Sequence, residues 1–431
     1  MQSIEFRYHR AAPPRLKVFG EQRRSRGDKV LDLGVERQLL ELHGRYRIGA
    51  LQDVGRDVDD CLCHVRFLPL IACHYTPNMA EKQQDRVSRK AATKAGVLLS
   101  ASDELDAVSL SIAQAWRVQH LEPTARCFEA LTQCAKHFEG AVVSYRLKRM
   151  TSILRKLQRR NSNFELGALD DIGGCRLIVG SVREVYEAAQ ILDDLLDHWK
   201  SKDYIAAPQR SGYRSYHAIY KVPIGGITYR IEVQIRTRLQ HLWATGVEAV
   251  GEVYGLEYKS PDVRASLEGE AQKRDRFLML SSHLFASEEG WPGVPDVADD
   301  LAVVRREVGA ICGSTQLLDD LRAARSGILV QTDSDETDEY FLLCLSREIQ
   351  FFDIVGFPEF EAANDEYQRL EKEALRTDIG NDITIAEPEF DNVVLVKAES
   401  AEAIKSSYLN YSLGVEGFIR QVEQASGLSL S

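Results

Sequence analysis

The chain has 431 residues, of which 44% are hydrophobic and 28% are charged, a composition typical of a folded globular protein. At roughly 100 to 200 residues per domain, this length predicts two or three domains. The sequence holds neither an apolar run of about eighteen residues nor the apolar core of a signal peptide, so we predict no membrane span and no export signal and expect a cytoplasmic protein.

The formal net charge of −11 is unevenly distributed along the chain. From Glu288 to the end there are 30 acidic and 11 basic residues, whereas the preceding part has 35 acidic and 43 basic residues. A basic front part suits phosphorylated ligands or nucleic acid. The acidic rear part is expected to be a solvated accessory module or an electrostatic partner of the front part.

Residues 1–78 lack sustained periodicity, and we expect either a poorly structured extension or a translation start at Met79. The eight cysteines of the chain are too few and too scattered for a disulfide framework. Potential zinc ligands in this region are Cys61, Cys63, His64, Cys73 and His74. Their spacing matches no standard pair-plus-pair pattern, so a zinc site is not favoured.

Residues 79–140 are predicted to form a helical N-terminal segment, because apolar residues such as Leu105, Val108 and Ile112 recur at helical spacing. The next stretch, "SYRLKRMTSILRKLQRR" from Ser144 to Arg160, has seven basic residues and no acidic one. Its opening alternates, which puts Arg146 and Lys148 on one face of an extended chain. Ser152 is predicted to cap a helix that places Lys156 one turn along. A solvated basic helix would show the same composition.

The segment "LDDIGGCRLIV", Leu169 to Val179, predicts a loop with a glycine pair that enters a buried strand, with Asp171 at the mouth of that strand. The next twenty residues predict one helix on the sheet, with Ser181 and Glu184 as a capping box and an apolar stripe that runs as far as Trp199. A basic loop then leads into a strand that ends at Val222.

The turn "PIGG" joins that strand to "TYRIEVQIRT", residues 228–237, and predicts a β-hairpin. The second strand alternates without a break, so its polar residues share one face: Arg230, Glu232, Gln234 and Arg236. A solvated surface strand would also alternate in this way. If the sheet brings Glu232 to Asp171, however, two carboxylates meet amid arginine and lysine, as magnesium-dependent phosphoryl transfer requires.

Neither a GxxxxGK[ST] phosphate loop nor a kinase-type GxGxxG with an HRD segment is present, so side chains must hold the phosphates. Four motifs follow in order: R-x-K with S-I-x-x-K, D-I-x-G-x-R, D-Y-I-x-x-P-x-x-x-G-Y-x-S-x-H, and E-V-Q-I-R-T. Over about Ser144 to Trp243, a quarter of the chain, this order resembles the RelA/SpoT synthetase family of alarmone pyrophosphokinases.

The resemblance implies transfer of the β,γ-pyrophosphate of ATP to the 3′-hydroxyl of GDP or GTP, with Mg²⁺ as cofactor. It assigns Mg²⁺ to Asp171 and Glu232, with Glu232 also helping to deprotonate the attacking hydroxyl. On the ATP side, the matching residues are Arg146, Lys148, Ser152, Lys156 and Arg176. Tyr213 matches the residue on which the acceptor base stacks. The further acceptor contacts it implies are Lys202, Arg210, Arg214, His217 and Gln234.

Each assignment has a structural alternative. Asp171 can cap a turn, His217 can be a hydrogen-bonded core histidine, and Tyr213 can pack rather than stack. Arg236 can orient the following helix instead of touching substrate. That helix departs from the commoner A-E-x-E-H pattern of the family, so core packing or capping is expected for His241, Trp243 and Glu248.

The chain contains no His-Asp dipeptide. Because the hydrolase of bifunctional relatives is built on such a pair, we expect synthesis without degradation. An acceptor other than a guanine nucleotide stays open, since some stand-alone relatives pyrophosphorylate the 3′ end of tRNA or make adenosine alarmones. A catalytically inactive nucleotide- or RNA-binding regulator is a third interpretation. The sequence does not indicate an oligomeric state.

We therefore predict an α+β fold, a mixed β-sheet flanked by helices as in a nucleotidyltransferase-like RelA/SpoT synthetase domain. The expected regions are residues 1–78 (extension), 79–140 (helical), 141–287 (synthetase) and 288–431 (an acidic α/β accessory module). The charge of the last region suggests that it docks on the basic site as an inhibitor or senses a ligand.

Overall fold

The computed structural model describes residues 86–101, 106–159, 164–325, 329–346, 351–373, 390, 392–401, 404 and 414–427. Residues 1–78, and with them the potential zinc ligands, lie outside the described residues. Among the helices that are described, none is long and apolar enough to cross a membrane. The described residues all belong to one compact unit.

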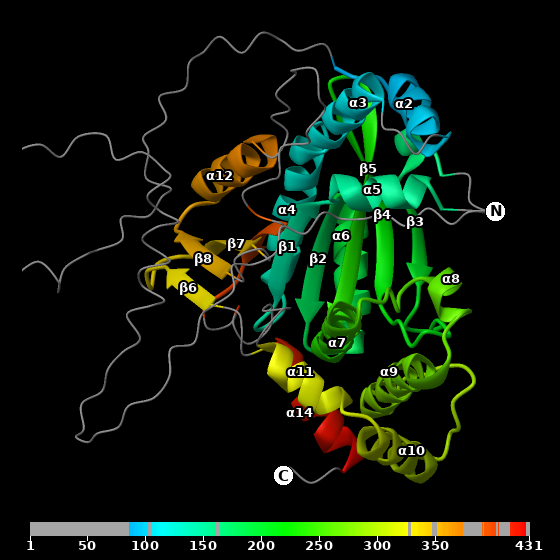
Figure 1. Cartoon of the computed structure of the whole chain (residues 1–431). Coiled ribbons are helices and arrows are strands. Elements are labelled where there is room, and N and C mark those ends of the chain that lie inside the picture. The colour runs from blue at the N-terminus through cyan, green and yellow to red at the C-terminus, as the bar shows by residue number, and fades with distance from the viewer. Residues whose placement is uncertain are drawn as a thin grey trace, which may run out of the picture. The chain divides into compact units, whose positions relative to one another are not determined.

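A mixed β-sheet runs through this unit, with the strand order β3-β4-β5-β2-β1-β9-β7-β8-β6 (Figure 1). The strands are β1 (Val142–Leu147), β2 (Gly173–Val179), β3 (Asp197–Asp203), β4 (Tyr216–Ile224), β5 (Ile227–Thr237), β6 (Leu329–Asp333), β7 (Tyr340–Ser346), β8 (Phe351–Phe357) and β9 (Asn392–Lys397). The pairs β2–β5 and β6–β8 are parallel, and the other neighbours are antiparallel. Together with the helices below, this confirms the predicted α+β fold with a mixed sheet.

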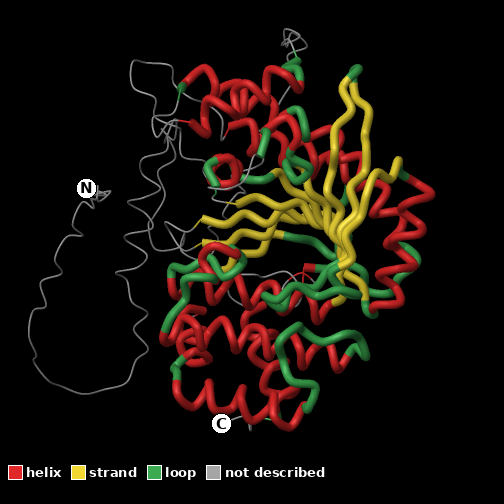
Figure 2. Tube along the Cα trace, turned by 90° about the vertical axis from the view of Figure 1, so that its right-hand side faces the viewer, coloured by secondary structure: helices red, strands yellow, loops and turns green. Residues whose placement is uncertain are grey.

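The predicted hairpin is formed by β4 and β5. Gly225 and Gly226 close it with positive φ angles of 53° and 80°, a conformation that glycine adopts at little cost. Only residues from Ile231 onward pair with β2, so the hairpin extends beyond its neighbour (Figure 2). Because side chains alternate along a strand, Tyr229, Ile231, Val233 and Ile235 are all buried on one face, and the polar residues between them lie on the other.

Helices flank the strands on both sides (Figure 2). The helices are α2 (Arg89–Ala101), α3 (Ala107–Val118), α4 (Leu121–Ala135), α5 (Met150–Leu157), the 3₁₀ helix η2 (Leu166–Ala168), α6 (Val182–Leu195), α7 (Arg238–Tyr254), α8 (Pro261–Arg264), α9 (Gly269–Glu288), α10 (Leu301–Ser314), α11 (Leu317–Arg325), α12 (Phe360–Glu373) and α14 (Gly414–Ser426). Helices α4, α6 and α12 share one hydrophobic core with the face of β5 that carries Ile231, and we call this the packed face. The opposite face, which carries Glu232, is called the cavity face.

Two local predictions were wrong. Helix α5 begins at Met150 with Arg149 as its N-cap, so Ser152 lies inside the helix rather than capping it. Helix α6 ends at Leu195, and Trp199 belongs to edge strand β3, where it is 39% exposed instead of packing in a helical stripe. The segment after Leu196 pairs with β4, and this strand pairing overrides the helical spacing of its apolar residues. At the start of α6, Ser181 Oγ caps the Glu184 N–H as predicted, while the Glu184 carboxylate accepts from Gly180.

The described strands of the acidic rear part belong to the same sheet as the front part. Strand β9 pairs with β1 and β7, so the described C-terminal strands continue the sheet that begins with β3. Helix α14 packs against α7 and α9, with Phe418 in contact with Phe277 and Phe285. A boundary near residue 288 and independent folding of the rear part stay predictions.

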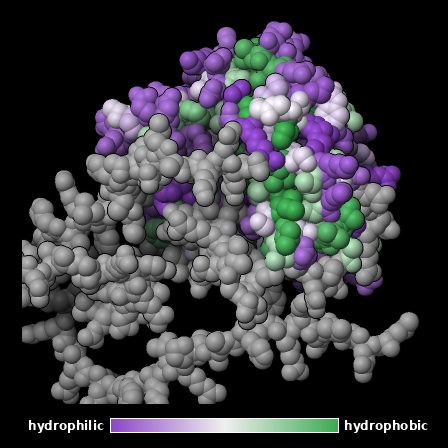
Figure 3. Space-filling model, turned by 90° about the horizontal axis from the view of Figure 1, so that it is seen from above, coloured by the Kyte–Doolittle hydropathy of each residue, from purple (hydrophilic) through white to green (hydrophobic). Residues whose placement is uncertain are grey.

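Apolar side chains remain exposed on the N-terminal helices. Val97 and Leu98 of α2 are 56% and 57% exposed, and Val108 of α3 is 67% exposed. From above, hydrophobic side chains form a band over these helices between polar neighbours (Figure 3). The described residues leave this band uncovered.

Candidate functional site

A cavity of about 620 Å³ lies on the cavity face, where β1, β2, β4 and β5 meet the helices α7 and α9. Its basic lining residues are Arg146, Lys148, Arg149, Arg159, Arg176, Arg236 and Lys259. Its acidic lining residues are Asp171, Glu232, Glu248 and Asp275. The cavity is therefore polar and has more basic than acidic side chains, which suits an anionic ligand.

Strand register explains why residues far apart in sequence meet here. Directly paired residues place their side chains on the same face of a sheet. Glu232 is paired with Gly174 of β2, and Gln234 is paired with both Arg176 and His217. A Cβ at Gly174 would meet no atom nearer than the Glu232 carbonyl oxygen at 3.9 Å, so this glycine leaves open space beside Glu232.

Asp171 is held by two lysines. Its Oδ2 atom accepts from Lys148 Nζ and from Lys156 Nζ, each at 2.8 Å. Burial by itself would raise the pKa of this carboxyl, but the charges of Lys148 and Lys156 outweigh that effect and leave the pKa below its usual value. The second oxygen, Oδ1, is buried and has no hydrogen-bond partner among the described residues. Asp171 thus presents an anionic oxygen that a cation can use.

Glu232 is held differently. Its Oε1 atom lies 3.0 Å from His217 Nδ1, and its Oε2 atom accepts from Gln234 Nε2 at 2.7 Å. Burial would raise the pKa of Glu232, yet the hydrogen bonds with His217 and Gln234 help to lower it on balance, while the nearby Asp171 charge acts in the opposite direction. The two carboxylates line one cavity, and the charge of Asp171 acts on the ionisation of Glu232.

The partners of Glu232 form a closed ring of hydrogen bonds. His217 Nε2 lies 2.6 Å from the Tyr213 hydroxyl, which accepts from Arg236 Nη2 at 2.6 Å, and Arg236 also donates to Gln234 Oε1 at 2.7 Å. Because a carboxylate can only accept, Nδ1 of His217 carries the proton toward Glu232. The Tyr213 hydroxyl can then donate to Nε2. The ring fixes the orientation of Glu232, and it also fixes Tyr213 and Arg236.

Most residues of the predicted ATP side lie at this cavity. Arg146, Lys148, Ser152 and Arg176 line it, and Lys156 reaches it through its ion pair with Asp171. The Arg176 Nε atom is buried without a hydrogen-bond partner in the described part of the chain, so it can donate to a ligand.

The predicted acceptor residues divide into two groups. Tyr213, His217 and Gln234 line the cavity, as does Arg236. Three others do not. Lys202 is exposed on edge strand β3, and Arg210 is exposed and lies 3.4 Å from Asp296. Arg214 is buried and pairs with Glu289 at 2.6 Å, so it ties the loop before β4 to the end of α9.

Several lining residues were not predicted as site residues. Glu248, for which packing or capping was expected, lines the cavity and accepts from Lys259 at 2.5 Å. Burial would raise its pKa, but the Lys259 charge, helped by Arg146, lowers the pKa strongly, so Glu248 is an anion at neutral pH. Trp243 also lines the cavity, whereas His241 is buried within α7. The basic composition of Ser144–Arg160 was the signal that would have added Arg149 and Arg159.

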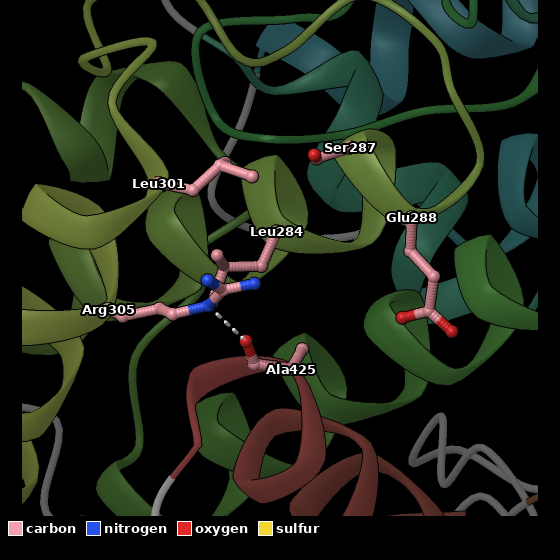
Figure 4. Close-up of a pocket in the computed structure, with 6 residues that line it drawn as sticks. All are labelled: Leu284, Ser287, Glu288, Leu301, Arg305 and Ala425. Atoms are coloured by element: carbon pink, nitrogen blue, oxygen red, sulfur yellow. Dashed lines mark hydrogen bonds between the residues drawn. The ribbon is translucent and has the colours of Figure 1, made fainter.

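A second, smaller cavity of about 180 Å³ lies between α9, α10 and α14 (Figure 4). Arg305 Nε donates to the Ala425 carbonyl oxygen at its edge, at 2.9 Å. None of the predicted site residues lines it. The chemistry therefore concentrates in the larger cavity.

Comparison with known proteins identifies the same part of the chain. Residues 145–260 match the region found in RelA / SpoT proteins. GTP pyrophosphokinase YwaC of Bacillus subtilis (strain 168) is 33% identical over 111 residues, which are 23% of this chain and 52% of YwaC. The probable GTP diphosphokinase RSH3 of Arabidopsis thaliana, a chloroplastic protein, is 37% identical over 105 residues, or 24% of this chain and 14% of that protein. The chain thus spans about half the length of YwaC, and less of RSH3.

Among solved structures, small alarmone synthetase 1 from Bacillus subtilis bound to its product pppGpp has 25% sequence identity and a TM-score of 0.32. The match covers 41% of this chain and 88% of that one. A GTP pyrophosphokinase family protein from Streptococcus pneumoniae also has 25% identity, with a TM-score of 0.33 over 44% of this chain and 93% of that chain. The comparisons by sequence agree with the order of motifs along residues 144–243.

Proposed function

Because residues 145–260 of this chain are a RelA/SpoT region, we propose that the protein transfers the pyrophosphate group of ATP to the 3′-hydroxyl of GDP or GTP. The observation that carries the proposal is the meeting of Asp171 and Glu232 at one cavity whose other charged residues are mostly basic. Phosphoryl-group transfer depends on this combination, because the reacting phosphates carry charge that side chains and a metal ion must neutralise.

In this reaction the acceptor O3′ atom forms a bond to the β-phosphorus of ATP. The bond between that phosphorus and the oxygen bridging to the α-phosphate breaks, and AMP leaves with the bridging oxygen. The hydroxyl proton must be removed, and we assign this role to Glu232, an anion held by His217 and Gln234.

Magnesium fits the same two carboxylates. Mg²⁺ is usually held by one or two carboxylates together with substrate phosphates and waters. Asp171 offers a buried oxygen without a partner among the described residues, and Glu232 is the second carboxylate of the cavity. When bound, the ion would neutralise phosphate charge and help to align the triphosphate.

We assign the donor triphosphate to the cluster of Arg146, Lys148, Lys156 and Arg176, with Ser152 as a further hydrogen-bonding group. Arginine suits this role because its planar fork can contact two phosphate oxygens at once. Lys148 and Lys156 are paired to Asp171, and they are expected to shift toward phosphate when ATP binds.

We assign the acceptor to the side of the cavity formed by Tyr213, His217 and Gln234. The Tyr213 ring is fixed through its hydroxyl, so it can offer a base a rigid surface for stacking. Lys202 and Arg210 are exposed and can reach longer acceptor groups, whereas the buried pair with Glu289 argues for a structural role for Arg214.

The test is to incubate the purified chain with γ-labelled ATP and magnesium while GDP, GTP, ATP and deacylated tRNA are offered in separate reactions. We expect label in GDP or GTP and the release of AMP. Label only in tRNA or in an adenine nucleotide would replace the proposed acceptor. No transfer to any of the four would contradict the proposed activity and favour a binding protein.

A further inference from the structure

The basic strand end that lines the cavity is held from the packed face by the C-terminal part of the chain. Strand β1 pairs with β9 only through Val143, Ser144 and Tyr145. Beyond that ladder, the N–H of Leu147 has no strand partner on the β9 side. It donates instead to the Tyr367 hydroxyl of α12, at 2.9 Å in a buried position. A side chain thus replaces the missing strand, because a buried N–H needs an acceptor.

The next residue is held by a second contact. Arg117 Nε of α3 donates to the Lys148 carbonyl oxygen at 2.6 Å. The same guanidinium forms an ion pair with Glu371 of α12, at 2.7 Å, and the two side chains are only 6% and 9% exposed. Tyr367 in turn donates to Glu371 Oε1 at 3.1 Å. Arg117, Tyr367 and Glu371 form one buried network, which we call the clamp.

The clamp holds the backbone N–H of Leu147 and the backbone carbonyl of Lys148, in the segment that carries the residues assigned to ATP. Arg146 and Lys148 lie on either side of Leu147, they line the cavity, and Lys148 Nζ contacts Asp171 at 2.8 Å. The clamp residues themselves do not line the cavity. They act on its cationic wall through the backbone, and small displacements of such groups weaken charge-assisted contacts strongly.

We propose that Tyr367, Glu371 and Arg117 are positioning residues for the donor site, and that α12 is an integral part of that site. The expected effect of these residues on ATP kinetics rests on the proposed function. The proposal gives the acidic rear part a supporting role. Helix α12 lies on the packed face and stabilises the position of β1 from the side opposite the cavity, instead of covering the cavity as an inhibitor.

The decisive variant is Tyr367→Phe, which removes the hydroxyl and keeps the ring. Leaving the Leu147 N–H without its acceptor should raise the KM for ATP about three- to tenfold, with a smaller change in kcat and no change in the KM for the acceptor. Hydrogen exchange at the Leu147 amide should accelerate in the same variant, and this readout does not depend on the reaction.

The matched control is Tyr220→Phe. The Tyr220 hydroxyl donates to Asp193 Oδ1 at 2.8 Å, and its ring belongs to the same hydrophobic core but lies on β4. We expect a comparable loss of stability and an unchanged KM for ATP. The proposal would be overturned if Tyr367→Phe and Tyr220→Phe changed the KM for ATP equally. It would also be overturned if Tyr367→Phe changed the KM for ATP and the KM for the acceptor equally, since the clamp residues would then contribute packing alone.

Glu371→Gln gives a second test, because the amide oxygen can still accept from Arg117 while the charge is lost. Glu371→Gln should raise the KM for ATP, as Tyr367→Phe does. If neither variant altered the ATP kinetics, the clamp would be refuted. If the wild-type chain transfers no pyrophosphate, the proposed function fails instead. Faster exchange at Leu147 in Tyr367→Phe would then still support the clamp, and unchanged exchange would refute it.

Discussion

The two halves of the sheet use the same face in different ways. In the front half (β3, β4, β5, β2 and β1), the cavity face carries polar side chains: Arg146, Arg176, His217, Glu232 and Gln234. In the rear half (β9, β7, β8 and β6), the same side carries apolar ones: Phe341, Leu343, Ile354, Val394 and Val396. The front half therefore provides most of the ligand cavity, whereas the rear half mainly packs and adds Asn392 and Val394 of β9 to the cavity lining. The contrast also predicts which variants affect activity and which affect stability.

The largest effect is expected for Glu232→Gln, which keeps the shape of the side chain and removes its charge. Transfer should fall by about a hundredfold to a thousandfold, the usual cost of losing one preorganised charged group in an active site. The variant should stay folded but lose some unfolding free energy at neutral pH, because the lowered pKa of Glu232 means that the folded state favours its charged form. The rate of labelled pyrophosphate transfer measures the activity, and denaturant titration measures the free energy of unfolding.

Glu187→Gln is the matched control, because Glu187 is an exposed residue of α6 that pairs only loosely with Arg183. It should behave like the wild type in both measurements. Near-normal turnover of Glu232→Gln would remove this carboxylate from the mechanism.

In the rear half, Leu343→Ala should affect stability and not chemistry. Leu343 is 3% exposed, and truncation of a buried leucine typically costs about 2–5 kcal/mol of unfolding free energy. Per folded molecule, the transfer rate should be retained. A loss of turnover beyond the loss of folded protein would mean that the rear half also shapes the ligand site.

Arg176→Lys separates geometry from charge in the front half. Lysine keeps the charge but loses the planar fork, so we expect the KM for ATP to rise about tenfold, equivalent to about 1.4 kcal/mol. Steady-state kinetics with varied ATP measures the change. The same exchange at the exposed Arg183 of α6 should have no effect, and an equal change at both positions would argue against a phosphate contact.

The smallest effect concerns Asp353 of β8. Burial, with the nearby Asp333 charge, raises the pKa of Asp353 from 3.8 to about 6, opposite to the lowered pKa of Asp171 and Glu232. The folded state therefore keeps a proton that the unfolded state releases. Stability contributed by this group is present below the unfolded pKa and is lost as the pH rises through about 6.

Asp353→Asn should accordingly be more stable than the wild type at pH 8, with little difference at pH 4. Chemical denaturation at the two pH values measures it. If Asp353→Asn is more stable than the wild type by the same amount at pH 4 and at pH 8, the ionisation of Asp353 does not affect stability.

Local sequence pattern was sufficient for much of the front half. The alternation of residues 228–237 predicted β5 and its polar face, and the glycine pair after Ile224 predicted the hairpin turn. The ordered motifs also led to Asp171, Glu232, Tyr213, His217 and Gln234, which all line one cavity. Side-chain alternation and turn conformation depend on neighbours in the chain, so they can be recognised without coordinates.

Tertiary contacts decided the rest. Arg214 lies within a matching motif but is buried against Glu289, a residue 75 positions away, and Trp199 fits a helical stripe but lies on an edge strand. Strand β9 lies beside β1, and Tyr367 of α12 accepts from the N–H of Leu147, although more than 200 residues separate the partners in each case. Contacts between segments so far apart depend on which backbone and charged groups need a partner in the folded chain. The local sequence pattern does not contain this information.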